Sequence, residues 1–183
     1  MAKYFFDTEF AENGPHEPIW FLSIGMVTED EDGSIREYYA VNKNFDKSKA
    51  NEFVLSNVIP KLKPKKEDMK TTDEIASDII AFVGDDLNPM FVADHCSYDW
   101  VVICQLFGTM MDLPDHFPKF CLDVQQLKES LGNPEFPQST EEVLDEHNAL
   151  ADAHECKGRW EFLQKYKFVG KNFNLKDWKK HRK

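Results

Sequence analysis

The sequence has no run of apolar residues long enough to cross a membrane, although 42% of its 183 residues are hydrophobic. A membrane-spanning helix needs about 20 consecutive apolar residues. The first residues lack the basic and apolar stretches of a secretion signal, and the chain contains no internal repeat or low-complexity tract. We therefore expect a cytoplasmic protein that does not bind membranes. Its length fits one domain over residues 1–168, followed by a basic tail at 169–183.

Paired cysteines are also missing. The chain has four cysteines, and none of them forms a Cys-x-x-Cys pair. His154 and Cys156 lie two residues apart, but no second pair of ligands accompanies them. The sequence therefore argues against a structural zinc site.

Basic residues are too few to balance the acidic ones. The chain has 22 Lys and Arg residues against 33 Asp and Glu residues, which gives a formal net charge of −11. Such a chain is not expected to coat nucleic acids, because it repels phosphate backbones. An enzyme that takes a strand end into a metal-lined site is compatible with this charge, since bound divalent ions offset nearby acids.

Two acids mark the first predicted strand. Residues 3–10 read Lys-Tyr-Phe-Phe-Asp-Thr-Glu-Phe, an aromatic-rich pattern typical of a β-strand. Because strand side chains alternate between faces, Asp7 and Glu9 leave the sheet on the same side. A cation such as Mg²⁺ or Mn²⁺ would hold this repelling pair through hard oxygen ligands. The alternative is an edge strand with two solvated acids.

The rest of the chain predicts a mixed α/β sheet covered by helices. Further strands are expected at residues 19–27, 35–41 and 90–93, and the first three strands form an antiparallel meander. Helices are expected from Asp46 to about residue 58, behind a capping box at 71–74, over 98–107 with Ser97 as cap, over 124–131 and over about 148–166. Residues 61–70 are predicted to form an exposed loop.

Three residues far along the chain are candidates for the same site. Asp99 lies in the first turn of its predicted helix, where the partly positive N-terminus favours an anion. His147 and Asp152 open the last helix, and both can act at one site only if His147 precedes the helix on a loop. Each residue also has a purely structural interpretation. Asp99 could support its helix end, His147 could be a helix-start residue bonded to a neighbour, and Asp152 could be a solvated acid. Asp94 is the second candidate for the role given to Asp99 at this site.

The order of these residues resembles a known enzyme family. Asp7-x-Glu9, then Asp99 after a short strand, then His147-x-Ala149-x-x-Asp152 resembles the histidine-containing branch of the DEDD exonuclease superfamily, with RNase T and oligoribonuclease as members. A closer resemblance to small, single-domain 3′-5′ exoribonucleases is carried by residues 4–10, 22–25, 38–41, 98–99 and 104–106. It implies an RNase H-like fold, two divalent ions (Mg²⁺ or Mn²⁺) and release of nucleoside 5′-monophosphates from the 3′ ends of single-stranded RNA.

The resemblance also implies a role for each residue of the pattern. Asp7 would bridge the two ions, and Glu9 and Asp152 would hold the ion nearest the attacking water. Asp99 would hold the second ion, partly through water. His147 would take the proton from the attacking water, since its pKa near neutrality suits a general base. Related enzymes are often dimers, so the resemblance is compatible with a homodimer.

Substrate contacts are predicted from aromatic residues near the first acids. Phe10 directly follows Glu9, and Phe10 and Trp20 could stack on bases, each contributing about 1–3 kcal/mol. Phe21 fits core packing better. Two competing functions stay open: a proofreading-type DNA exonuclease, because no residue identifies contacts to the 2′-hydroxyl, and a non-enzymatic acidic mimic of nucleic acid. The enzyme needs a divalent ion, whereas the mimic does not.

Overall fold

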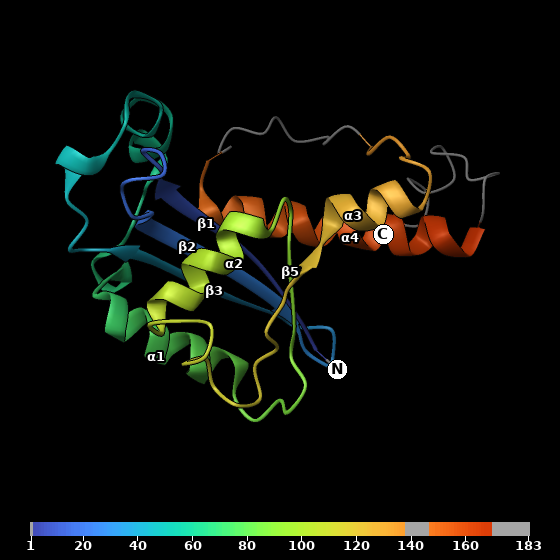
Figure 1. Cartoon of the computed structure of the whole chain (residues 1–183). Coiled ribbons are helices and arrows are strands. Elements are labelled where there is room, and N and C mark those ends of the chain that lie inside the picture. Colours follow the sequence, from blue (N-terminus) through green and yellow to red (C-terminus); the bar gives the residue numbers. More distant parts are fainter. Residues whose placement is uncertain (1, 138–146, 170–183) are drawn as a thin grey trace.

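The computed structural model describes residues 2–137 and 147–169, and its centre is a six-stranded sheet (Figure 1). The strand order is β4-β3-β2-β1-β5-β6. The strands are β1 (Lys3–Ala11), β2 (Trp20–Glu29), β3 (Ile35–Asn42), β4 (Met69–Lys70), β5 (Met90–Ala93) and β6 (Leu122–Asp123). β2 is antiparallel to both β1 and β3, whereas β4, β5 and β6 each join a neighbour in parallel. The predicted RNase H-like mixed sheet is confirmed.

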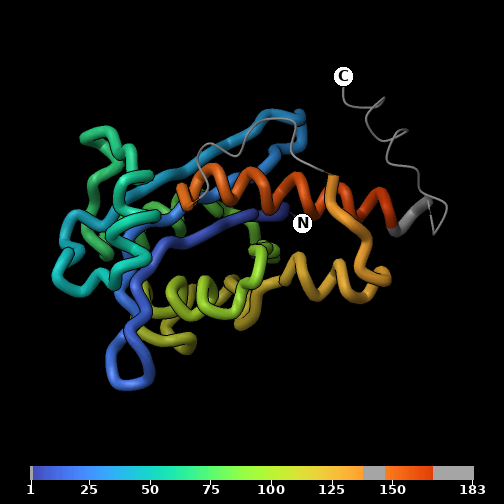
Figure 2. Tube along the Cα trace, turned by 90° about the horizontal axis from the view of Figure 1, so that it is seen from above, coloured from blue at the N-terminus to red at the C-terminus, as the bar shows by residue number. Residues whose placement is uncertain are grey.

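Helices cover both faces of this sheet. Seen from above in Figure 2, α4 lies on one face of the strands and α2 lies on the other. The helices are α1 (Thr72–Val83), α2 (Ser97–Leu106), α3 (Val124–Ser130) and α4 (Ala149–Val169), with α1 beside α2. The predicted capping box is present, because the Thr71 hydroxyl accepts from Glu74 N–H and the Glu74 carboxylate accepts from Thr71 N–H.

The alternation of side chains along β1 divides the core into two layers. Phe6 packs toward α1 and α2 with Ile79 and Ile103, whereas Phe5 packs toward α4 with Trp160. Phe5 and Phe6 are both almost fully buried. Because Asp7 and Glu9 have the same parity as Phe5, the sheet presents them to the layer that contains α4.

Three expectations for the helices and loops were wrong in detail. Asp46 caps only the short 3-10 turn η1 (Lys47–Lys49), and a separate wide turn, η2 (Val54–Val58), follows and leads into η3 (Ile59–Lys61). Residue Ser97 is the first residue of α2 and not its cap, because Cys96 occupies the cap position. The predicted loop at 61–70 contains the turn η4 (Lys66–Asp68) and ends in β4, which extends the sheet. Pairing with a distant strand overrode the local proline and lysine pattern.

Within residues 2–137 and 147–169, no helix is long and apolar enough to cross a membrane. The predicted basic tail lies outside the described residues, apart from the last residue of α4, Val169. The family resemblance carried no expectation for that tail.

Candidate active site

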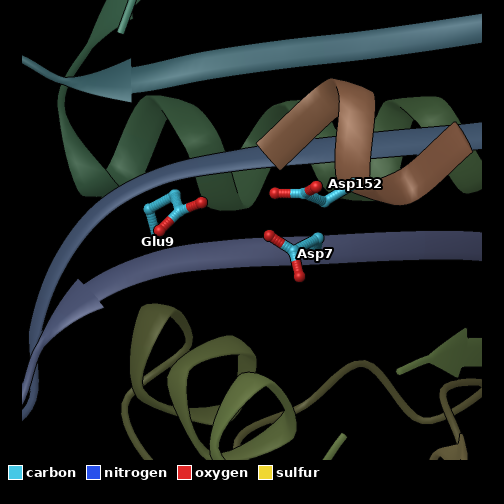
Figure 3. Close-up of side chains that lie close together, drawn as sticks. All are labelled: Asp7, Glu9 and Asp152. Atoms are coloured by element: carbon cyan, nitrogen blue, oxygen red, sulfur yellow. The ribbon is translucent and has the colours of Figure 1, made fainter. Parts of the chain in front are cut away.

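Three carboxylates from two distant parts of the chain meet beside β1. Asp7 and Glu9 project from β1, and Asp152 projects toward them from the first turns of α4 (Figure 3). One carboxylate oxygen of each residue lies within 4.8 Å of those of the other two. This arrangement of oxygen donors suits a hard divalent cation such as Mg²⁺ or Mn²⁺.

A close backbone contact brings Asp152 to the strand. Gly25 pairs with Asp7 across β1 and β2, and the beginning of α4 lies directly on it. A Cβ atom at Gly25 would lie 2.3 Å from the carbonyl carbon and oxygen of Ala149 and from the Cα of Leu150. Only a residue without a side chain allows this approach. Gly25 therefore determines how closely α4 and the Asp152 carboxylate can approach β1.

His147 stands immediately before α4, off the regular helix as expected. Its φ of 68° lies in the left-handed region, which histidine adopts more readily than most residues. Its backbone N–H donates to Asp152 Oδ2 at 3.0 Å, so this residue also helps to position the Asp152 carboxylate. The imidazole ring lies edge-on to the ring of Phe53, with ring centres 5.2 Å apart. Both the helix-start interpretation and a catalytic role are compatible with this geometry.

Asp99 is near the three acids but is engaged elsewhere. Pairing of β1 with β5 ends at Phe5, and the start of α2 fills the open edge beyond it. There Asp99 Oδ1 accepts from the backbone N–H and the hydroxyl of Thr8, at 2.9 and 2.7 Å. Asp99 is not in the group of acids within 4.8 Å, although it lies close enough to raise the pKa of Asp7. Of the four predicted acids, Asp7, Glu9 and Asp152 therefore form one cluster, and Asp99 lies beside it.

The carboxyl groups of Asp7 and Glu9 have strongly raised pKa values. Burial raises the pKa of Asp7 well above its usual range, and the negative charges of Asp99 and Glu9 add to this effect. Burial also raises the pKa of Glu9 to about 8, with Asp152 as the next cause. Every charge contributing to these two shifts is negative. A bound divalent cation would supply the missing positive charge.

Asp94, the runner-up to Asp99, belongs to a structural network. It forms an ion pair with Arg159 of α4, and its other oxygen accepts from Gln125 Nε2 at 2.7 Å. Arg159 in turn pairs with Glu155 one helical turn earlier. These contacts tie the end of β5 to α3 and α4, and they compensate the charge of Asp94 without a metal ion.

The raised pKa values predict an unusual pH dependence of stability in metal-free protein. The folded protein keeps protons that the unfolded chain loses above the ordinary Glu pKa of 4.5, so stability should fall as pH rises from about 5 to about 8. Excess Mg²⁺ should oppose this fall, because metal binding favours the ionised carboxylates. Thermal unfolding at several pH values in EDTA and in Mg²⁺ measures both effects. A Glu9→Gln variant should flatten the EDTA curve, and equal slopes in parent and variant would contradict the assignment.

The two predicted substrate contacts, Phe10 and Trp20, each lie against another side chain. Phe10 stacks on Tyr98 at the start of α2, with ring centres 5.8 Å apart and planes inclined by 14°. Trp20 lies at the start of β2, with the Lys49 ammonium 5.0 Å from its ring centre. Phe21 is buried in the core, as expected.

One aromatic residue beside the site has no clear signal in the sequence. Phe53 is 55% exposed and lies against His147, although the sequence predicted only a helix over this segment. The wide turn η2 instead buries Val54 and Val58 and leaves Phe53 facing outward. Turns of this type often occur at functional sites.

Solved exonucleases share this fold. The zinc-bound complex of E. coli exonuclease I with single-stranded DNA matches with a TM-score of 0.57 and 12% sequence identity over 92% of this chain. A full-length 3′-exonuclease matches with a TM-score of 0.52 and 14% identity, covering 90% of this chain and 82% of its own. This chain spans only 43% of exonuclease I. At these identities the likeness shows the fold alone.

Sequence relatives are closer. The 3′-5′ exoribonucleases Rv2179c and MT2234.1, from two strains of Mycobacterium tuberculosis, are each 37% identical to this chain over 165 residues. The alignment covers 88% of this chain and 92% of each relative. The family model of the Rv2179c-like 3′-5′ exoribonuclease domain matches residues 2–164, which include the sheet and the three converging acids. The chain therefore belongs to the Rv2179c-like 3′-5′ exoribonuclease domain family.

Proposed function

We propose that this protein hydrolyses single-stranded RNA from its 3′ end and releases nucleoside 5′-monophosphates in a reaction that depends on Mg²⁺ or Mn²⁺. The observation that carries the proposal is that Asp7, Glu9 and Asp152 meet. Among the described residues, only burial and negative charges account for the raised pKa values of Asp7 and Glu9. Membership of an exoribonuclease family supports the reaction type. The acidic-mimic alternative gives no reason for three acids to converge in a half-buried site.

The acids would divide the binding of two ions between them. Asp7 is near Glu9, Asp152 and Asp99 and would contact both ions, while Glu9 and Asp152 would complete one site. Asp99 would hold the second ion, partly through water, because one of its oxygens is already bonded to Thr8. When bound, such a pair of ions supplies a water that ionises readily and stabilises the negative charge of the leaving oxygen.

His147 would act as the general base, which would place the chain in the histidine-containing branch of the superfamily. Its backbone is anchored to Asp152, and its ring lies on the exposed side of the turn against Phe53. A rotation of the side chain could bring the ring to the attacking water once substrate is bound. The imidazole nitrogen would then accept the proton that the water loses.

RNA is favoured over DNA because two relatives that are 37% identical to this chain are named exoribonucleases. The neighbours solved with single-stranded DNA are only about one-third as similar in sequence, at 12% identity against 37%. A DNA exonuclease is the second candidate, since the same acids could hydrolyse either backbone.

Digestion of 5′-labelled oligonucleotides in Mg²⁺ tests the proposed function directly. We expect RNA to shorten stepwise from its 3′ end, with nucleoside 5′-monophosphates as the released product. An RNA with a 3′ phosphate and a circular RNA should both resist, because neither offers a free 3′ hydroxyl. Faster digestion of the matching DNA would favour the second candidate, and rapid cutting of the circle would indicate an endonuclease.

Replacing His147 with alanine separates its side chain from its backbone role. The variant keeps the N–H that donates to Asp152, so we expect ion binding close to that of the parent. Turnover should fall by about 10²–10⁴-fold, the usual contribution of a general base. His154→Ala is the matched control, because His154 lies on the outer surface of α4 and pairs with Glu37. Equal turnover in both variants at saturating Mg²⁺ would make His147 a helix-start residue only.

A further inference from the structure

A pocket of about 260 Å³ lies at one end of the sheet, away from the three acids. It is formed by the start of β2, the segment after β3, the first residue of α1 and the last turns of α2. In Figure 1, α2 crosses the sheet toward the beginning of α1, and the pocket lies where they meet. The lining includes Trp20, Phe21, Asn44, Phe45, Gln105 and Leu106.

The lining combines flat apolar walls with exposed amides. Trp20 and Phe45 are half-buried aromatic residues that line the pocket. Asn44 and Gln105 are exposed at its rim. A nucleobase has the complementary character, because its faces stack on aromatic rings and its edge exchanges hydrogen bonds with amides.

Residues of β1 and α2 lie between the acids and this pocket. Phe10 follows Glu9, pairs with Phe21 across β1 and β2, and stacks on the half-exposed ring of Tyr98. Tyr98 lies on the same side of α2 as Gln105 and Leu106, which are seven and eight residues further along and line the pocket, with the buried Val102 between them. At 1.5 Å per residue, the Tyr98 to Leu106 segment is about 12 Å long.

Two lysines stand beside the pocket in an otherwise acidic protein. Lys47 and Lys49 follow the lining residue Asp46 in the turn η1. Lys49 lies over the Trp20 ring, and its ammonium group is 3.9 Å from the Glu17 carboxylate. With a net charge of −11, a path for RNA needs such local positive charge for its phosphates.

We propose that this pocket binds a nucleobase of single-stranded RNA upstream of the 3′ end that enters the acid cluster. The inference rests on the proposed exoribonuclease function and extends it, since the pocket would make affinity depend on substrate length. A dinucleotide held at the acids is too short to span α2, whereas a decanucleotide reaches the pocket.

The first test compares Michaelis constants for a decanucleotide and a dinucleotide of RNA. In Trp20→Leu, the KM for the decanucleotide divided by the KM for the dinucleotide should rise by about 5- to 150-fold, since one stacked base contributes about 1–3 kcal/mol. In Gln105→Ala, this ratio should rise by a smaller factor. Gln126→Ala, at an exposed position of α3, is the matched control and should keep the parental ratio. Damage to the fold or to the acid cluster would change both KM values together and leave their ratio constant. A constant ratio in Trp20→Leu would overturn the proposal.

The second test measures binding without hydrolysis. Fluorescence anisotropy of a labelled decanucleotide in EDTA should show weaker binding by both pocket variants than by parent and control. A series of decanucleotides with one abasic site each should locate a single upstream position whose loss matters in the parent and no longer matters in Trp20→Leu. If no upstream position has an effect, the pocket does not bind a base. If binding responds as expected but RNA is not shortened, the proposed function fails while the pocket assignment stands.

Discussion

Asp7→Asn should abolish RNA hydrolysis while leaving the protein folded. Asp7 lies close to Glu9 and Asp152, and its pKa is raised by burial and by the charges of Asp99, Glu9 and Asp152. Asparagine keeps the shape but loses the charge that a divalent ion requires, and charge stabilisation by such ions amounts to several kcal/mol, or about 10³-fold or more in rate. Initial rates on labelled RNA over a range of Mg²⁺ concentrations measure the loss.

Stability measurements separate this effect from unfolding. Because the substitution removes one of several repelling charges, the melting temperature of Asp7→Asn in EDTA should equal or exceed that of the parent at pH 8. Asp85→Asn, in the exposed loop between α1 and β5, is the matched control and should keep parental activity. Near-parental hydrolysis by Asp7→Asn would exclude Asp7 as an ion ligand.

Gly25→Ala should weaken ion binding and activity although residue 25 carries no chemistry. Its new Cβ would lie 2.3 Å from backbone atoms of Ala149 and Leu150, and no side-chain rotation can relieve this clash because the backbone fixes the position of a Cβ atom. The start of α4 must move outward and take Asp152 with it. We expect a loss of about 1–3 kcal/mol in stability and a 10- to 100-fold loss in ion affinity, roughly the effect of removing a supporting residue.

A second glycine provides the comparison. Gly33 lies in the hairpin between β2 and β3 at φ 84°, and a Cβ atom added to it would meet no other atom within 4 Å. Gly33→Ala should cost about 1–2 kcal/mol through backbone strain and leave ion affinity unchanged. Calorimetric titration with Mn²⁺ of both variants, alongside thermal unfolding, separates the two effects. Equal ion affinities in the two variants would mean that α4 is not positioned by its contact with Gly25.

Local patterns in the sequence were sufficient for most of the fold. Side-chain alternation in β1 placed Asp7 and Glu9 on one face, and the Thr71 box marked the start of α1. The short strands β4 and β6 could not be predicted, because two residues carry no periodicity and their pairing depends on distant strands. The same is true of the wide turn that exposes Phe53.

The site was harder to predict than the fold because it depends on contacts between distant segments. The motif order indicated which acids belong together, but not that Asp99 would bond to Thr8 while the other three meet. Nor did Gly25 in a strand reveal that α4 would rest on it. These contacts form only when the sheet and the two helices are assembled.

The three converging acids are proposed to hold divalent ions that are required for hydrolysis at the RNA 3′ end. The most direct test removes metal with EDTA, restores Mg²⁺ in steps, and records hydrolysis of 5′-labelled RNA together with ion binding. We predict no hydrolysis in EDTA and a rate that rises in parallel with occupancy of the site in the parent, but not in Asp7→Asn. Hydrolysis at the full rate in EDTA would contradict the requirement for ions.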